Sequence, residues 1–252
     1  MSQSAPAAMA ATKVIEFIAD CPGDVGISEI CRGTDLNKNM VFRILTTLEA
    51  QGWVYSDNQK YGLTLVPFGI CSKALTKITL NNAATPVLHD LWQKTGESTY
   101  LGVLDGDKVL YLQHLDGVGD VRVAGRTGGR YDIYCSAPGK VLLAHAGEEF
   151  IEEYLKNDFK PLTDKTVVEK GAIRKNLELI RKNGYATDRE EFGGGITCVA
   201  APVFDLEGKV IGTIGCSAFT PGGDCDKVIE RLLPEVVSAA KKISTRLGYK
   251  YE

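Results

Sequence analysis

The sequence predicts an α+β chain with an N-terminal winged helix-turn-helix domain and a C-terminal antiparallel-sheet domain, joined by a linker helix. Three observations support this prediction. Residues 27–65 have the order helix, turn, helix and hairpin. Further along, alternating apolar strands come in pairs around turns such as Asp105-Gly106-Asp107, and helical stretches separate the pairs. The length of 252 residues exceeds the usual size of one domain, so two cores are expected.

The first two helices are predicted from apolar residues at helical spacing. The first helix carries Val14, Ile15, Phe17 and Ile18. A short second helix carries Ile27, Ile30 and Cys31 at i, i+3 and i+4. Gly33 and Thr34 are expected to supply the turn after it, and the first helix would close a three-helix core.

A third helix and a hairpin complete the N-terminal domain. Asn37 is a good N-cap, and Gly52 suits a helix end with positive φ. The buried face of this helix repeats apolar residues at i, i+3, i+4 and i+7, which are Val41, Ile44, Leu45 and Leu48. Residues 53–55 and 61–65 are predicted to be strands, with a turn at 56–60.

The opposite face of the third helix carries the candidate DNA-binding side chains, which are Lys38, Asn39, Phe42, Arg43, Thr46 and Thr47. Arg43 can form two hydrogen bonds with guanine, while Lys38 and Thr46 suit phosphates. Lys60 lies at the hairpin tip, within reach of a phosphate or the minor groove. The alternative is that these are ordinary solvated positions, but the turn before the helix and the hairpin after it favour double-stranded operator DNA as a partner.

The N-terminal segment is not basic. Residues 1–66 contain five lysines and arginines and seven acids, a net charge of −2. Neutralisation of phosphates is the main source of non-specific affinity for DNA. We therefore expect weak non-specific binding and reliance on a homodimer or homotetramer.

Composition indicates a globular protein, with 44% hydrophobic and 24% charged residues. No apolar run reaches the roughly 18 residues that a membrane span needs, so no membrane partner is expected. The start SAPAAMAAT lacks the features of a signal peptide. Seven cysteines without a CxxC motif indicate reduced thiols and a cytoplasmic protein. No cofactor is predicted.

The predicted domains are residues 1–66, a linker helix at 67–82, and an effector-binding and oligomerisation domain at 83–252. The linker has an apolar stripe made of Phe68, Ile70, Cys71, Leu75, Ile78 and Leu80. Helices are then predicted at 82–96, 137–146, 148–156, 169–183 and 226–247, the last bent by its proline. Strands are predicted at 98–104, 109–114, 118–125, 197–204 and 210–218.

Four segments stand out by their combination of residues: VFRILTTLEAQGWV in the winged helix, GRYDIYCSAPGKVLLA at 129–144, GYATDREEFGGGITCVAAPVFD at 184–205 and GTIGCSAF at 212–219. Together they resemble the isocitrate-lyase-regulator (IclR) family of bacterial transcription factors, from about residue 13 to residue 245. The resemblance implies a GAF-like C-terminal domain that binds a small organic acid or aromatic effector. It also implies dimers formed through the N-terminal domains, and pairs of dimers formed through the sensor domains.

The family's effector pocket, carried onto this sequence, falls on Ser136, Ala137, Asp188, Cys198, Gly215 and Ser217. Backbone N–H groups at the start of the 137–146 helix can hold a carboxylate. Ser217 can add a hydroxyl, and Asp188 can accept from a ligand hydroxyl or fix its loop. Asp188 could equally be a capping residue, and Cys198 a small buried hydrophobe. Nearby cations are Arg122, Arg126 and Arg130.

The sequence departs from the family in two places. Residues 37–40 lack the Ser-Thr pair frequent at the start of the recognition helix, and Gly215 stands where some relatives have serine. The candidate pocket is also rich in thiols, from Cys135, Cys198 and Cys216. A Zn²⁺ site or a thiol-reactive ligand is conceivable. However, Cys216 should face away from its strand neighbours, so no metal site is predicted.

No catalytic motif is evident. The three histidines, His89, His114 and His145, lie outside any nucleophile motif. Ser217 is in GCSAF and not in G-x-S-x-G. The sequence therefore predicts a non-enzymatic regulator. Two alternatives stay open: a GAF-like protein that binds a small molecule or metal and has catalytic activity, and a regulator whose C-terminal domain only oligomerises.

Overall fold

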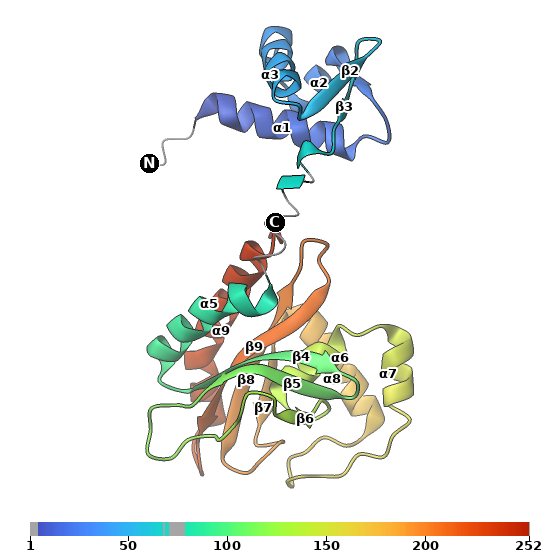
Figure 1. Ribbon diagram of the computed structural model, residues 1–252. Coiled ribbons are helices and arrows are strands. Elements are labelled where there is room, and N and C mark those ends of the chain that lie inside the picture. The colour runs from blue at the N-terminus through green and yellow to red at the C-terminus, as the bar shows by residue number, and fades with distance from the viewer. Residues whose placement is uncertain (1–4, 68, 71–78, 252) are drawn as a thin grey trace. The chain divides into compact units, whose positions relative to one another are not determined.

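The computed structural model describes residues 5–67, 69–70 and 79–251 (Figure 1). The chain divides into two compact units, residues 1–77 and 78–252. Most of the predicted linker helix, at 68 and 71–78, lies outside the described residues. Residues 80–82 belong to the first helix of the second unit.

The N-terminal unit is a winged helix-turn-helix, as predicted. Its elements are α1 (Pro6–Asp20), β1 (Val25–Gly26), α2 (Ile27–Thr34), α3 (Lys38–Ala50), β2 (Val54–Asp57) and β3 (Lys60–Leu63). The strands form an antiparallel sheet in the order β1-β3-β2. Its core is a cluster of apolar side chains, which are Val14, Ile18, Val25, Ile30, Val41, Leu45 and Val54.

The predicted turn at residues 33 and 34 is wrong. Helix α2 continues through Thr34, and the chain reverses at Asp35, which has the left-handed φ of 57°. Gly33 is a packing residue, because a Cβ there would lie 1.9 Å from Cε2 of Phe17. The glycine therefore permits close approach of α1 and α2 and does not form the turn.

The wing is tighter than predicted. Strand β2 extends to Asp57 and β3 begins at Lys60, so the turn contains only Asn58 and Gln59, with φ of 47° and 62°. Two left-handed residues are typical of a two-residue hairpin. Strand β1 was not predicted; it pairs Val25 with Tyr61 and adds a third strand.

The C-terminal unit is built on a six-stranded antiparallel sheet in the order β6-β5-β4-β9-β8-β7. The strands are β4 (Ser98–Asp105), β5 (Lys108–Leu115), β6 (Arg130–Asp132), β7 (Ala186–Arg189), β8 (Ile196–Phe204) and β9 (Val210–Phe219). The helices are α5 (Leu80–Thr95), α6 (Ala137–Ala144), α7 (Glu148–Tyr154), α8 (Lys170–Asn183) and α9 (Cys225–Arg246).

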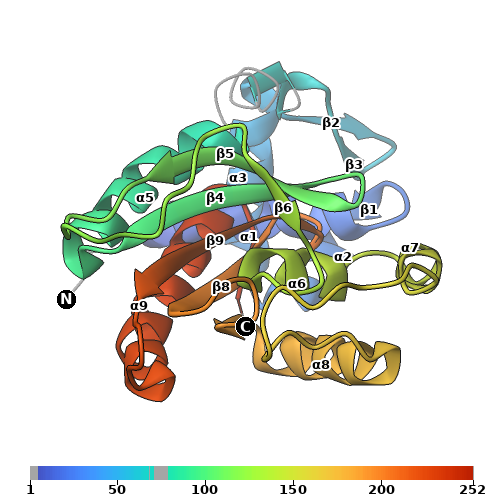
Figure 2. The same ribbon diagram turned by 90° about the horizontal axis from the view of Figure 1, so that it is seen from below.

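The helices cover the two faces of this sheet separately (Figures 1 and 2). One core joins α5 and α9 to strand residues such as Leu101 and Ile214. The other joins α6, α7 and α8 to strand residues such as Tyr100 and Ala200. Because neighbouring strand residues alternate between faces, Tyr100 and Leu101 enter different cores. None of the helices in the described part of the chain could span a membrane.

Two strand assignments differ from the sequence prediction. The strand predicted at 118–125 is wrong, since these residues have no regular structure and Val118 is 70% exposed. Strand β6 takes the place beside β5 instead. Strand β7 was missed because ATDR has no apolar run, yet it brings Asp188 into the sheet opposite Cys198.

Candidate functional site

The candidate DNA-binding face lies on α3. The N-cap Asn37 accepts a hydrogen bond from the Met40 N–H, with Oδ1 at 2.9 Å. Val41 and Leu45 are fully buried. The predicted contact residues of this helix are all exposed, and they are Lys38, Asn39, Phe42, Arg43, Thr46 and Thr47. The structure therefore brings these six side chains to one accessible surface.

The charged side chains of this face form no ion pair with the described residues of the unit. Lys38 and Arg43 form no ion pair with any residue that the structure describes. Lys60 is exposed directly after the wing turn. Acids nearby are engaged elsewhere: Asp24 accepts from the Tyr55 hydroxyl at 2.8 Å, and Glu49 accepts from Ser56 Oγ at 2.6 Å. The cations are thus available to an anionic partner although the segment is acidic.

A small cavity of about 30 Å³ lies in the C-terminal unit, on the face of the sheet covered by α6. Four of the six predicted effector residues line it, namely Ser136, Asp188, Cys198 and Ser217. Ala137 and Gly215 do not line it. The 123–125 segment, which precedes β6, forms part of its wall.

Strand register explains how distant residues meet at this cavity. Asp188 on β7 is paired with Cys198 on β8, and Cys198 is paired with Ser217 on β9. Cys198 Sγ and Ser217 Oγ are 3.1 Å apart. The three side chains therefore form a row across the sheet.

Asp188 is the most unusual residue in this row, because it is fully buried. Its Oδ1 accepts from the N–H groups of Glu191 at 2.7 Å and Phe192 at 3.3 Å. Its Oδ2 forms no hydrogen bond of ordinary geometry with the described residues, and the Cys198 thiol is close enough for Asp188 to contribute, after burial, to the raised pKa of that thiol. Burial raises the pKa of Asp188 to about 6, although the positive charge of Lys140 and the Glu191 N–H group oppose the rise. The carboxyl group is thus both a capping residue for the following turn and an unpaired acceptor at the cavity.

A buried ion pair that the sequence analysis missed supports this region. Lys140 on α6 is only 2% exposed. Its Nζ pairs with Glu191 and donates to the Thr187 carbonyl oxygen at 3.1 Å. The available signal was a single lysine within the otherwise apolar helix APGKVLLA, since buried charges are normally paired.

Ser136 begins α6 as its N-cap. Its Oγ accepts from the Gly139 N–H at 3.3 Å and donates to the Asp132 carbonyl oxygen at 2.5 Å. Pro138 has no N–H. The Gly139 N–H is therefore already paired and is not free for a carboxylate. The N–H groups of Ser136 and Ala137 remain the predicted donors at the start of the helix.

Aromatic side chains form much of the cavity wall, and sequence reasoning missed them. Tyr100 and Tyr111 are stacked with ring centroids 4.8 Å apart, and Tyr131 lies 4.5 Å from Tyr111 and 5.8 Å from Phe192. Burial is the main cause that raises the pKa of Tyr100 and of Tyr111, so both phenols are neutral. Alternation along β4 and β5 was the signal that could have placed them on one face.

Gly215 leaves room for Tyr100, a residue that lines the cavity. A Cβ at this position would lie 2.3 Å from the Val199 carbonyl oxygen and 2.5 Å from the Tyr100 hydroxyl. The serine of some relatives would not fit here without movement of the backbone. Gly215 and Tyr100 therefore act as a complementary pair in this chain.

The thiols and arginines are dispersed. Cys216 lies on the opposite face of the sheet, 4.0 Å from Thr95 Oγ1, and burial raises the pKa of the Cys135 thiol to about 12. The described residues contain no group of three or more His, Cys, Asp or Glu side chains suited to a metal. None of the three arginines lines the cavity, since Arg122 and Arg130 pair with surface acids and Arg126 lines a separate groove.

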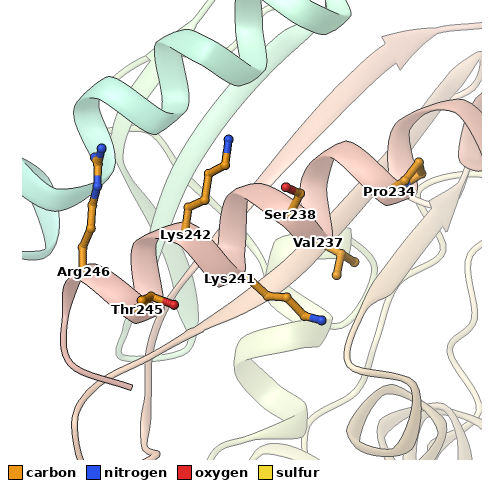
Figure 3. A pocket seen from close by; sticks show the side chains of 7 residues that line it. All are labelled: Pro234, Val237, Ser238, Lys241, Lys242, Thr245 and Arg246. Carbon is orange, nitrogen blue, oxygen red and sulfur yellow. The ribbon is translucent and has the colours of Figure 1, made fainter. Parts of the chain in front are cut away.

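A larger hollow of about 540 Å³ runs along α9 (Figure 3). Arg246 and Lys242 are directed toward α5, and Arg246 Nη1 donates to the Ala83 carbonyl oxygen at 3.0 Å. Lys241 points away and lies 5.4 Å from the Tyr251 ring centroid. This hollow is lined by one helix and contains none of the predicted effector residues.

Both halves of the chain match known families. Residues 8–58 match the IclR helix-turn-helix domain, and residues 72–245 match the bacterial transcriptional regulator IclR C-terminal domain. The chain belongs to the IclR family. It is therefore a DNA-binding transcriptional regulator with a C-terminal effector domain, and the IclR-family relatives are regulators and not enzymes.

Individual relatives agree with this assignment. The regulator KdgR of Escherichia coli is 32% identical over 229 residues, which cover 90% of this chain and 87% of KdgR. The regulator BhcR of Paracoccus denitrificans is 33% identical over 237 residues, covering 93% and 84%. The IclR structure from Thermotoga maritima aligns with a TM-score of 0.63 at 30% identity, covering 96% of this chain and 98% of that one.

A more distant structure shows the fold alone. The Agrobacterium tumefaciens repressor BlcR aligns with a TM-score of 0.82 at 22% identity, covering 99% of this chain and 100% of BlcR.

Proposed function

We propose that this chain is a cytoplasmic regulator that binds a pseudo-palindromic operator as a homodimer or homotetramer and senses a small organic or aromatic acid. The observation that carries the sensing role is the unpaired Oδ2 of the fully buried Asp188, which lines a cavity. An unsatisfied buried acceptor costs about 1–3 kcal/mol. Such a cost is understandable where a ligand supplies the missing partner.

The proposed DNA contacts are Lys38, Asn39, Phe42, Arg43, Thr46, Thr47 and Lys60, and the proposed effector contacts are Ser136, Ala137, Asp188, Cys198, Gly215 and Ser217. In the structure, Ala137 and Gly215 lie outside the cavity lining, so their proposed contribution is to support its shape.

Ligand entry must enlarge the cavity. A volume of about 30 Å³ is far below the roughly 300–1,000 Å³ of a typical ligand pocket. The wall with least regular structure is the 123–125 segment, which has no helix or strand. Gly125 lies against His114 so closely that a Cβ would be 2.3 Å from Nε2. We propose that an effector displaces this segment, and that the resulting difference in affinity between two arrangements couples the cavity to DNA binding.

Thermal shift measurements on the full chain test this proposal. A panel of small organic and aromatic acids is expected to contain a compound that raises the melting temperature with dose, because a ligand that binds the folded state stabilises it. The matched control is Asp188→Asn, which keeps an oxygen for the Glu191 and Phe192 N–H groups but replaces Oδ2.

The small volume of the cavity favours one competing function, a C-terminal unit that only oligomerises. If no acid raises the melting temperature of the wild type, this second function becomes the better account. An equal rise in the wild type and in Asp188→Asn would remove Asp188 from the ligand site.

A further inference from the structure

The outer surface of α3 contains two adjacent strips of different chemistry. One strip, at i and i+4, is formed by Asn39 and Arg43, whose side chains can form hydrogen bonds with adenine and guanine. The neighbouring strip, also at i and i+4, is formed by Phe42 and Thr46. The first strip explains polar recognition of bases. The second strip lies outside the hydrophobic core of its unit, as the structure describes that core.

Phe42 is conspicuous because this large apolar residue is 55% exposed. It is outside the hydrophobic core of its unit, whereas Val41 and Leu45 beside it are fully buried. Tyr55, the exposed aromatic residue of the wing, differs because its hydroxyl donates to Asp24 at 2.8 Å. The Phe42 side chain thus buries little apolar surface when its unit folds, and it is available to an apolar partner.

Hydrogen bonds within α3 make this surface more apolar than the sequence suggests. Thr46 Oγ1 donates to the Phe42 carbonyl oxygen at 2.9 Å, and Thr47 Oγ1 donates to the Arg43 carbonyl oxygen at 2.9 Å. Both hydroxyl protons are therefore used inside the helix. Each threonine offers a partner its methyl group and an oxygen lone pair, and no hydroxyl proton.

The major groove of DNA presents one apolar group, the 5-methyl group of thymine. We propose that Phe42, supported by Thr46, contacts a thymine methyl group in each operator half-site and so determines specificity at that base pair. This inference rests on the proposed role of α3 in operator recognition. It adds an apolar reading of thymine to the polar contacts of Asn39 and Arg43.

The test begins with the operator itself. Duplexes that bind the full chain are selected from a random library, and each thymidine of the selected site is then replaced singly by deoxyuridine, which removes only the methyl group. We expect one position in each half-site to lose about four-fold in affinity, the effect of burying one methyl group. Other positions should change less than two-fold.

Variants of the apolar strip identify the side chain responsible. Phe42→Ala should lose most of the preference for thymine over uracil, whereas Phe42→Leu should retain a larger part of it. Thr46→Ser removes the methyl group but keeps the hydroxyl, and it should reduce the same preference. The exposure of both positions makes a loss of folding unexpected, and the melting temperature checks this.

Two results would overturn the inference: no thymine-to-uracil change weakens binding by the wild type, or the full penalty persists in Phe42→Ala. The first of these needs no variant, so it does not depend on the folding of one. Failure of the proposed function looks different, because the wild type would then enrich no duplex at all, or Arg43→Ala would bind the selected operator as tightly as the wild type.

Discussion

The two candidate sites of this chain are built in opposite ways. The α3 surface comes from ten consecutive residues, 38–47, and its predicted contact residues are all exposed. The cavity is assembled from strands at both ends of the sheet and from the start of α6, and its polar residues are buried. An exposed site such as the α3 surface lowers the stability of the fold little. In a buried site such as the cavity, each polar group needs a hydrogen-bond or charge partner inside the protein to offset its loss of water.

Removal of one cation from the α3 surface and of one from the buried pair that supports the cavity should show this difference most strongly. Lys140→Met leaves Glu191 buried without its partner, and breaking a buried ion pair typically costs about 3–5 kcal/mol of stability. Chemical unfolding of the C-terminal unit measures the loss. The double variant Lys140→Met, Glu191→Gln should recover much of it. If Lys140→Met is as stable as the wild type, the buried pair is not the support that we describe.

Arg43→Ala is the matched change on the exposed site. Since Arg43 has no ion-pair partner among the described residues, the melting temperature should stay within about 4 °C of the wild type. Operator affinity should fall by about 5- to 150-fold, the effect of losing one bidentate base contact of about 1–3 kcal/mol. Fluorescence anisotropy with a labelled duplex measures it. Unchanged affinity would remove Arg43 from the DNA-contacting surface.

Asp188→Asn sharpens the comparison through pH. The pKa of Asp188 is raised in the folded chain to about 6, from an ordinary value near 4. Its contribution to stability is therefore fully present below pH 4 and is lost as the pH rises through about 6. At pH 7 the asparagine variant should gain up to about 2–3 kcal/mol relative to the wild type, and this gain should vanish near pH 4.

Unfolding curves of both proteins between pH 4 and pH 8 measure this difference. A difference that does not vary with pH would mean that Asp188 titrates at its ordinary value. The same variant also reports how a ligand uses Oδ2. If a ligand carboxylate shares a proton with Asp188, affinity should rise as pH falls toward 6; if a ligand hydroxyl donates to the ionised group, affinity should fall.

Ser217→Ala should have the smallest effect of the series. It removes one hydroxyl at the cavity, close to Cys198 Sγ, and one neutral hydrogen bond contributes about 1 kcal/mol. We expect effector affinity to fall by about five-fold, measured by calorimetric titration, with operator affinity unchanged in the absence of effector. An unaltered effector affinity would limit the site to the Asp188 side of the cavity.

The same contrast explains what the sequence could predict. The helical period of α3 depends on neighbours along the chain, so its buried and exposed faces were read correctly from Val41, Leu45 and their spacing. The turn before it was misplaced because Gly33 has a packing role against Phe17 that no local rule reveals. The location of this turn therefore depends on a contact between residues that are distant in the sequence.

Predicting the cavity would have required knowledge of contacts between residues that are distant in the sequence. Asp188, Cys198 and Ser217 were named from the resemblance to a family, and only strand register places them in one row. The Lys140–Glu191 pair and the tyrosine walls were missed, because sequence spacing does not show which residues meet across a sheet. The irregular 118–125 segment was predicted to be a strand, but β6 at Arg130–Asp132 pairs with β5 instead.

The central claim is that a ligand in the cavity changes operator affinity, and one titration tests it most directly. An acid that raises the melting temperature is added at saturation to the wild type and to Asp188→Asn, and operator affinity is measured with and without it. The account predicts a change of at least five-fold in the wild type, the lower range for allosteric coupling, and a much smaller change in Asp188→Asn. An operator affinity that stays the same in the wild type at saturating ligand would contradict the account.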